Sequence, residues 1–466
     1  MLMDYQKIFF KTLVSSLVLY KGLFAIENYG AYITPMCYTK TEQNGRITNP
    51  CYACHTNGEE PNYFNELALQ QEYLFPKQMM QNPYTNLFKD REAEIEKISD
   101  SFILNYISLS NYNKALQEKY NCFFHFDAEG FDRDPKGRFT LWRAFVYKPF
   151  VGTFFPTNGS IDDVILRLPE IFAQDEKGQF SIDMYKSNLQ TLLHNIQNSQ
   201  SNTKRYIGKA STMRVDAGLY PVGTEFLHSV RYIDFHAGKA EGSKRFKELR
   251  YGKKERYLSY SELELLADDE ALEEVDAEGL PAMQSYLKDP FGGFYNALGW
   301  RFLGYIEDQK GNLRLQNQEE ALSCIGCHAK LGATTDSTFA FKRHLRWGYQ
   351  DLYGIDDADG EYKKYLEQNP SGNEYGSNDE VLEKFFYKGG EKKTEAFKKL
   401  SEDITILVIP SYKRAMQLNK AYYLIVKEQS FIYAKEVVIR AMHNVYKKIE
   451  ERDTKIKEII SSEKRN

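Results

Sequence analysis

The spacing of apolar residues predicts helices in several parts of the chain. Residues 261–271 predict a helix opened by a capping box of Ser261 and Glu264. From about residue 379 onward the chain is charged and of helical character. Residues 92–106 predict a further helix, because the following apolar side chains recur at helical spacing: Ile95, Ile98, Phe102, Ile103 and Tyr106. In the tail, one apolar stripe should pack against the body of the protein: Val438, Met442, Val445 and Ile449.

Other segments have the character of strands. Residues 120–126 and 140–147 are aromatic and partly alternating, and residues 224–236 alternate more regularly. The acidic and glycine-rich residues 127–137 predict a hairpin turn, because a calcium loop would need Glu at the position of Arg143. Together these patterns predict a mainly α protein with some β structure, of the α+β class.

Length and composition indicate a globular protein of two or three domains. The chain has 466 residues, of which 42% are hydrophobic and 27% charged, and its net charge is -4. Without a basic excess it is not expected to bind nucleic acid. No run of 18 apolar residues is present, so no typical transmembrane helix is expected.

The N-terminus resembles a secretory signal. Lys7 and Lys11 precede the apolar residues 12–20, and a cleavage site is expected near Ala25. A buried first helix, or an uncleaved membrane anchor, would also fit this segment. The expected organisation is a signal peptide at 1–25, an N-terminal region at 26–150, a mixed middle region at 151–285 and a C-terminal region with a helical tail at 286–466.

The cysteines carry the most specific chemical signal. Residues 51–55 read Cys-Tyr-Ala-Cys-His and residues 324–328 read Cys-Ile-Gly-Cys-His, so both follow the Cys-x-x-Cys-His pattern of c-type haem attachment. The two intervening residues let both thiols reach the vinyl groups on one edge of the haem. The histidine that follows can then bind the iron. A zinc site or a redox dithiol is the alternative for such cysteines.

The two motifs resemble those of di-haem c-type cytochromes. The resemblance implies two haem c groups, attached to Cys51 and Cys54 and to Cys324 and Cys327. The N-terminal region at 26–150 and the C-terminal region at 286–466 are therefore expected to be haem c regions that flank the mixed middle region. His55 and His328 are the expected proximal iron ligands. Di-haem cytochrome c peroxidases carry their motifs closer together in a shorter chain, so no peroxidase role is transferred to any residue here.

The second axial ligand of each iron would normally be His or Met. His228 and His236 are the leading candidates, because both lie on one face of the alternating segment 224–236. Eight residues of strand separate them by roughly 26 Å, so they could not bind the same iron. Less favoured candidates are His125, His194, His344, His443, Met79, Met80 and Met416.

Cys37 and Cys122 lie outside the motifs. Outside the cytoplasm two spare thiols tend to pair, so a Cys37–Cys122 disulfide is expected, with two separate buried thiols as the alternative.

These features predict an exported, periplasmic electron carrier with redox proteins as partners. The alternative is a haem-dependent, peroxidase-like oxidoreductase with one open iron site. A haem-based sensor is a third and weaker possibility.

Overall fold

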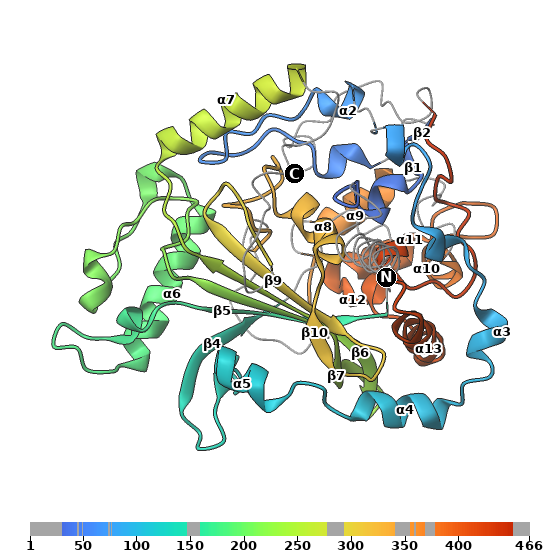
Figure 1. Cartoon of the computed structure of the whole chain (residues 1–466), viewed down its shortest axis with the longest axis horizontal. Helices are drawn as coiled ribbons and strands as arrows, with labels where there is room; N and C mark the ends of the chain where they lie inside the picture. Colours follow the sequence, from blue (N-terminus) through green and yellow to red (C-terminus); the bar gives the residue numbers. More distant parts are fainter. Residues whose placement is uncertain are drawn as a thin grey trace, which may run out of the picture.

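The protein is built around one large antiparallel sheet (Figure 1). The computed structural model describes residues 30–43, 46–48, 50–72, 75, 77–146, 159–276, 293–340, 355–357, 360–368 and 378–450. The sheet has eight strands in the order β10-β9-β7-β6-β5-β4-β3, and β8 pairs with the same edge of β9 as β10 does. The α+β class is therefore confirmed.

The strands of this sheet come from all three of the segments expected between residues 26 and 466. They are β3 (Phe131–Arg133), β4 (Phe139–Phe145), β5 (Ile161–Arg167), β6 (Glu225–His236), β7 (Lys239–Lys254), β8 (Phe294–Tyr295), β9 (Trp300–Glu307) and β10 (Leu313–Leu315). A separate hairpin joins β1 (Thr41–Gln43) and β2 (Arg46–Thr48). The predicted strand at 224–236 is confirmed as β6.

Helices gather around the sheet, with α9 to α13 on one side and α6 and α7 on another (Figure 1). The α-helices are α2 (Leu69–Glu72), α3 (Glu92–Ile95), α4 (Asp100–Ser108), α5 (Lys114–Tyr120), α6 (Ile182–Gln197), α7 (Tyr260–Asp276), α8 (Gln318–Cys327), α9 (Glu361–Gln368), α10 (Asp379–Phe385), α11 (Thr394–Glu402), α12 (Thr405–Val408) and α13 (Tyr412–Glu428). Among the residues that the structure describes, none of these helices combines the length and apolar character needed to cross a bilayer.

The two faces of the sheet carry different chemistry. Residues directly opposite each other on neighbouring strands share a face. One face is apolar and lies under α5, and its core includes Trp142, Ile165, Leu227, Leu249 and Leu303. On the other face, His228 of β6 lies opposite Arg250 of β7, and Phe302 of β9 lies beside α8. The polar face therefore meets the second Cys-x-x-Cys-His segment.

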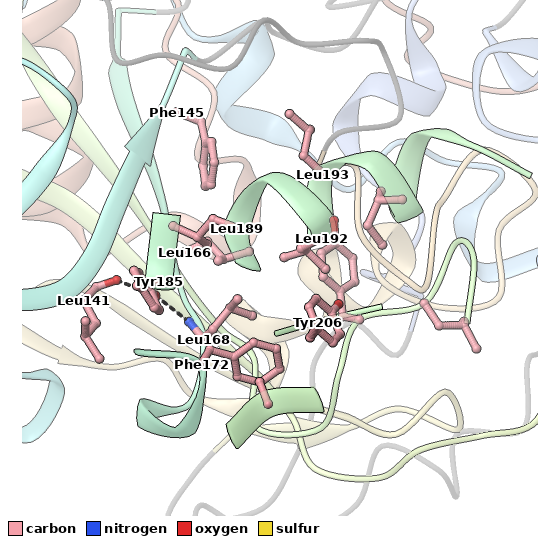
Figure 2. Packing of buried hydrophobic residues seen from close by; sticks show 14 of the residues in the cluster. Leu141, Phe145, Leu166, Leu168, Phe172, Tyr185, Leu189, Leu192, Leu193 and Tyr206 are labelled. Atoms are coloured by element: carbon pink, nitrogen blue, oxygen red, sulfur yellow. Dashed lines mark hydrogen bonds between the residues drawn. The ribbon is translucent and has the colours of Figure 1, made fainter. Parts of the chain in front are cut away.

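A second apolar core fills the space between α6 and one end of the sheet (Figure 2). Leu189 and Leu192 of α6 pack there with Leu166 and Phe172. The buried Tyr185 hydroxyl donates to the Leu141 carbonyl at 2.7 Å and accepts from the Leu168 amide at 2.9 Å. Its hydrogen bonds tie β4 and β5 to α6.

Four turns follow one local pattern, Asp-x-x-Gly. In each turn the aspartate carboxylate accepts backbone N–H groups two and four residues later, and the glycine amide donates to the aspartate carbonyl. Each glycine has positive φ, which suits its missing side chain. The turns are Asp127–Gly130, Asp134–Gly137, Asp175–Gly178 and Asp308–Gly311. The second closes the β3–β4 hairpin, which confirms the predicted turn in 127–137.

Several predicted boundaries were wrong for local reasons. The helix predicted at 92–106 is divided into α3 and α4, because Ser99 caps α4 by accepting the Phe102 amide at 3.1 Å. The capping box of α7 is Ser259 with Glu262, two residues earlier than predicted.

The strand predicted at 120–126 does not form. Tyr120 ends α5, and the Asp132 carboxylate accepts the amides of Phe123 and His125 at 3.0 and 2.8 Å. A side chain thus takes the hydrogen bonds that a strand partner would have taken.

The tail stripe is buried, but it is not helical. Val438, Met442, Val445 and Ile449 lie in one core with residues of the N-terminal segment, including Tyr38 and Met79. The tail is extended there, with an antiparallel bridge from Thr39 to Val445. Hence the two ends of the described chain pack against each other.

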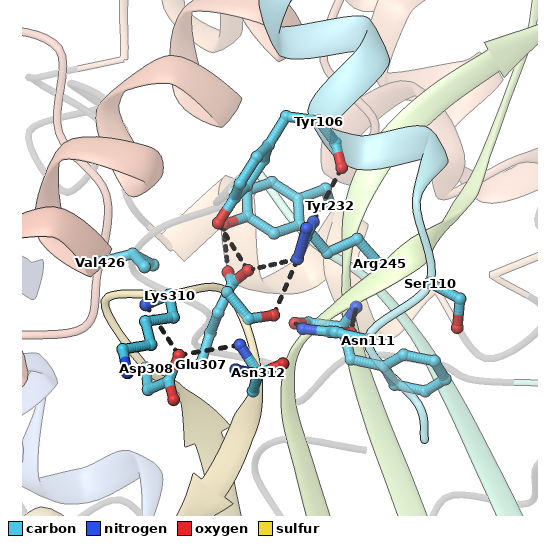
Figure 3. Close-up of polar contacts among 12 residues, drawn as sticks. Tyr106, Ser110, Asn111, Tyr232, Arg245, Glu307, Asp308, Lys310, Asn312 and Val426 are labelled. Atoms are coloured by element: carbon cyan, nitrogen blue, oxygen red, sulfur yellow. Dashed lines mark hydrogen bonds and ion pairs between the residues drawn. The ribbon is translucent and has the colours of Figure 1, made fainter. Parts of the chain in front are cut away.

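A buried carboxylate holds the far end of the sheet together (Figure 3). Glu307 is fully buried and accepts the hydroxyls of Tyr106 and Tyr232, both at 2.6 Å, and a guanidinium N–H of Arg245 at 2.9 Å. Burial raises the pKa of Glu307 to about 7, against the opposing effect of these donors.

We expect Glu307→Gln to change the pH dependence of folding. Between about pH 4.5 and 7 the unfolded chain releases the Glu307 proton while the folded chain keeps it, so wild-type stability falls as pH rises. Gln cannot titrate, so the free energy of unfolding of the variant relative to wild type should rise over this window, by up to about 1.4 kcal/mol per pH unit. Denaturant unfolding at pH 5 and pH 7 measures this difference. Glu96→Gln, on the surface, is the control, and an equal pH response in both variants would contradict the prediction.

Candidate haem-attachment site

Both Cys-x-x-Cys-His segments adopt a single helical turn. The first forms a short 3-10 helix at Cys51–Ala53, and the second is the last turn of α8. In each, the amide of the histidine donates to the carbonyl of the first cysteine at 2.9 Å. The turn brings residues three apart to one side, so the two thiols of each motif face the same way.

The two motifs lie side by side, although 273 residues separate His55 from His328. The Ala333 amide donates to the Cys54 carbonyl at 3.3 Å. Burial raises the pKa of the Cys327 thiol well above its usual value, and the charges of Cys54, Cys37 and Cys324 raise it further. Cys327 is thus within electrostatic range of the other motif.

Asn62 holds the two segments together. Its side-chain amide donates to the carbonyls of Leu331, Gly332 and Thr334 at 2.8, 3.2 and 2.9 Å. Its own oxygen accepts the Phe64 amide at 3.1 Å. One buried asparagine therefore fixes the chain that follows the second motif against the loop that follows the first.

Two glycines allow this close approach. A side chain on Gly326, inside the second motif, would collide with the Tyr32 carbonyl oxygen. One on Gly332 would collide with the Thr56 carbonyl oxygen. Backbone contacts backbone at both places, so only glycine fits.

Each motif histidine is oriented through its Nδ1 atom. The Nδ1 of His55 is 3.0 Å from Oε1 of Glu66, and the Nδ1 of His328 is 2.9 Å from the Ser337 carbonyl oxygen. Metal-binding histidines usually have such a partner on the nitrogen that does not bind the metal. This arrangement fixes the orientation of each ring through Nδ1.

A tight turn holds the partner of His328. Asp336 and Ser337 both have positive φ, 44° and 63°, and Thr335 and Thr338 exchange backbone hydrogen bonds, as in a type I′ turn. Asp336 forms a buried ion pair with Lys254. The Ser337 hydroxyl donates to the His328 carbonyl at 2.6 Å. The turn is therefore anchored at both of its central residues.

Burial keeps the His328 ring neutral. It lowers the pKa of His328 to about 4, and the charges of Arg250 and His228 add to this effect. A neutral imidazole is the form that binds a metal. Phe302 and Phe339 lie against the ring, with centroid distances of 4.8 and 5.9 Å.

The polar face of the sheet supplies further groups beside the second motif. Nε2 of His228 is 3.0 Å from Oδ2 of Asp162 on β5, and Nε of Arg250 is 3.2 Å from Oε2 of Glu248. Arg250 is partly exposed, with 38% of its side-chain surface accessible. Arg250 also interacts electrostatically with Cys324 of the second motif.

The structure separates the two leading axial candidates. His228 lies close enough to His328 to affect its pKa. His236 is at the other end of β6, with 86% of its side chain exposed and Glu241 at 3.8 Å. Of the remaining histidines, His125 and His443 are exposed and His194 is 2.7 Å from the Asn202 carbonyl, while His344 lies outside the described residues.

The predicted Cys37–Cys122 disulfide was wrong. Both thiols are free. Cys122 is buried on the apolar face of the sheet with Trp142, whereas Cys37 packs with Tyr38 and Met79 near Cys327. The sheet and the second motif separate the two cores.

The donor set of the candidate site consists of four cysteines and two histidines. None of the four motif cysteines forms a disulfide, and each motif carries one oriented histidine. Within the described part of the chain, no three His, Cys, Asp or Glu side chains are grouped closely enough for one metal ion, which a zinc site made of both cysteine pairs would need.

Glu66, Asn62 and Ser337, which position the motifs, and Arg250, which lies beside the second motif, were not predicted from the sequence. Their sequence distance from the residues they contact left no local pattern to read.

Comparison with known proteins gives the family. The model of a family described as "-like lipoprotein" matches residues 116–354, about half of the chain. An uncharacterized lipoprotein of Aquifex aeolicus (strain VF5) is 32% identical, over 87% of this chain and 85% of its own length. The chain belongs to this lipoprotein family. No solved structure matches the chain.

This finding corrects the resemblance to di-haem c-type cytochromes as a statement of family. The family match begins after the first Cys-x-x-Cys-His motif and includes only the second. Two five-residue motifs are too short to define a family across the rest of the fold. As a lipoprotein, the protein is exported, which agrees with the signal-like N-terminus.

Glu66 should be essential for the contact between the motifs. It is buried, and while Oε1 faces His55, Oε2 accepts the Gly332 amide at 2.6 Å. In Glu66→Gln, the new side-chain NH2 group replaces one of the two carboxylate oxygens. It would then face either the Gly332 N–H or the His55 Nδ1, and one hydrogen bond would be lost. We expect a loss of about 1–3 kcal/mol in the free energy of unfolding. Denaturant unfolding measures it, with the exposed Glu59→Gln as control. Equal stability of the two variants would refute the role of Glu66.

Proposed function

We propose that this lipoprotein is an electron-transfer protein that carries two covalently bound haem c groups. Cys51 and Cys54 would hold one group and Cys324 and Cys327 the other, with His55 and His328 as proximal iron ligands. Each bound haem would supply one-electron redox chemistry. The single observation that carries the proposal is that both motifs, each with its histidine oriented through Nδ1, form one continuous site.

The residues between the motifs suit electron exchange within the protein. Asn62 and Glu66 fix the two attachment segments against each other, so the distance between two groups held there would change little. The aromatic rings of Phe302 and Phe339 and the burial of His328 exclude water from the second group. A rigid and dry environment lowers the reorganisation that accompanies gain or loss of an electron.

The working location that we propose is the periplasm, where a lipid anchor would keep the protein at a membrane surface. Family membership supports export, and haem c is attached outside the cytoplasm. Redox proteins are the proposed partners.

Protein matured with the haem-attachment machinery should carry two haem masses. Cys51→Ser/Cys54→Ser and Cys324→Ser/Cys327→Ser should each carry one, because each pair of thiols makes its own thioether bonds. Intact-mass measurement after denaturation counts them. Cys122→Ser, which removes a buried thiol outside the motifs, is the control and should keep both. Protein without covalent haem would refute the proposed function.

For the second haem we propose His228 as the sixth iron ligand. His228 is near His328, and the Asp162 carboxylate can orient its ring. We expect a low-spin iron in wild type and a high-spin, carbon monoxide-binding iron in His228→Ala, read by visible and spin-resonance spectra. His236→Ala, at the exposed end of the same strand, should leave the spectra unchanged. A low-spin signal that survives in His228→Ala would remove His228 from the site.

A haem-dependent oxidoreductase with one open iron is the second candidate. The observation that favours it is the partly accessible Arg250 beside the second motif, since a cation there could assist a small polar substrate. Carbon monoxide binding by reduced wild-type protein would place this candidate first.

A further inference from the structure

A group of charged residues, of which Glu248 is buried and the others are partly buried, lies beside the second motif and has no role in holding it. Glu248 and Arg250 come from β7, and Lys435 and Glu436 follow a short 3-10 helix at Phe431–Tyr433. That short helix packs against α8, which carries Cys324 and Cys327. Buried charges are costly unless they are paired, so each of these groups needs a reason.

Glu248 has three polar partners. Its Oε2 atom is 3.2 Å from Nε of Arg250, 3.5 Å from Nζ of Lys435 and 3.1 Å from Nε2 of Gln316. Burial opposes its ionisation, but the charges of Arg250 and Lys435 outweigh burial and hold the pKa of Glu248 at about 2. Glu248 is therefore a fixed anion that engages both nearby cations.

Glu436 is the opposite case. Its Oε2 atom is buried and has no hydrogen-bond partner. The neighbouring ammonium of Lys435 is already engaged by Glu248. Burial raises the pKa of Glu436, and the charge of Glu248 adds to this, against smaller opposing effects of its own amide, Lys435 and Arg250. A negative charge added nearby would raise the pKa of Glu436 further.

Glu436 lies within electrostatic range of the second motif. Burial raises the pKa of Tyr84, and the charges of Tyr38, Glu436, Cys37 and Cys327 raise it further, so Glu436 and Cys327 act on the same phenol. Arg250 interacts with both Glu436 and Cys324. A charge added at the second motif would therefore change the pKa of Glu436.

Resting on the proposed function, we infer that Glu436 takes up one proton from solvent when the second haem site accepts one electron. The electron comes from a one-electron donor and its negative charge stays at the second site. The proton forms an O–H bond on the Glu436 carboxylate, so the buried region keeps its net charge. A nearby like charge favours the neutral acid, which is the direction of this coupling.

The groups that face Glu436 support this assignment. Glu248 and Arg250 face it from β7, Lys435 from its own segment and Tyr84 from the N-terminal part of the chain. Glu248 and Arg250 are bound to each other. The Tyr84 hydroxyl donates to the Ile33 carbonyl at 2.5 Å and burial raises its pKa far above neutrality. Of these groups, Glu436 alone has both a raised carboxyl pKa and an unpartnered buried oxygen.

The test is the pH dependence of the midpoint potentials of the haem-loaded protein. In wild type one midpoint potential should fall as pH rises, by up to 59 mV for each tenfold change in proton concentration, the value for one electron and one proton. In Glu436→Gln that slope should be lost. Electrochemical reduction of wild type in weakly buffered solution should also take up protons from the solvent, and reduction of the variant should take up fewer.

Glu395→Gln, an exposed residue on α11, makes the same change of charge and should keep the wild-type slope. Glu436→Asp keeps a titratable carboxyl group and should keep a slope, which covers the case in which the Gln variant fails to fold. A slope unchanged in folded Glu436→Gln, or absent in wild type, would overturn the inference. Absence of covalent haem would instead overturn the proposed function.

Discussion

The arrangement of this protein depends on the contact between the loop after the first Cys-x-x-Cys-His motif and the loop after the second. Asn62 bonds three carbonyls of residues 331–334, and Glu66 joins His55 to the Gly332 amide. These are buried polar groups, so leaving any of them unpaired would cost about 1–3 kcal/mol. Loss of any one of these hydrogen bonds would therefore weaken the contact that holds the two motifs together.

One face of the sheet places polar side chains beside the two motifs. His228 and Arg250 lie opposite each other on β6 and β7, and their partners Asp162 and Glu248 share the same face. The opposite face carries an apolar core around Trp142 and Leu249, beside an ion pair of Arg167 with Glu225. The sheet therefore has an apolar core on one face and the charged side chains beside the motifs on the other.

Three glutamates of this protein differ in their pKa values because their neighbouring groups differ. Glu248 has two cations and stays ionised, Glu307 has two hydroxyls and one guanidinium and titrates near neutrality, and Glu436 has an oxygen without a partner. Burial is common to all three. The number and charge of the donors, rather than depth, decides which of them holds a proton.

The sequence alone determined what depends on residues close together in the chain. The helical turn of each motif, the alternation of β6 and the Asp-x-x-Gly turn of the β3–β4 hairpin follow from local spacing, because their hydrogen bonds span only a few residues. Apolar spacing alone misled at Val438 and Val445, where pairing with residue 39 replaced a helix. Only the tertiary structure brought Cys54 to Ala333, Glu66 to Gly332 and Asp162 to His228. Such contacts join residues tens to hundreds of positions apart, and no local pattern encodes which of the many possible pairs the fold selects.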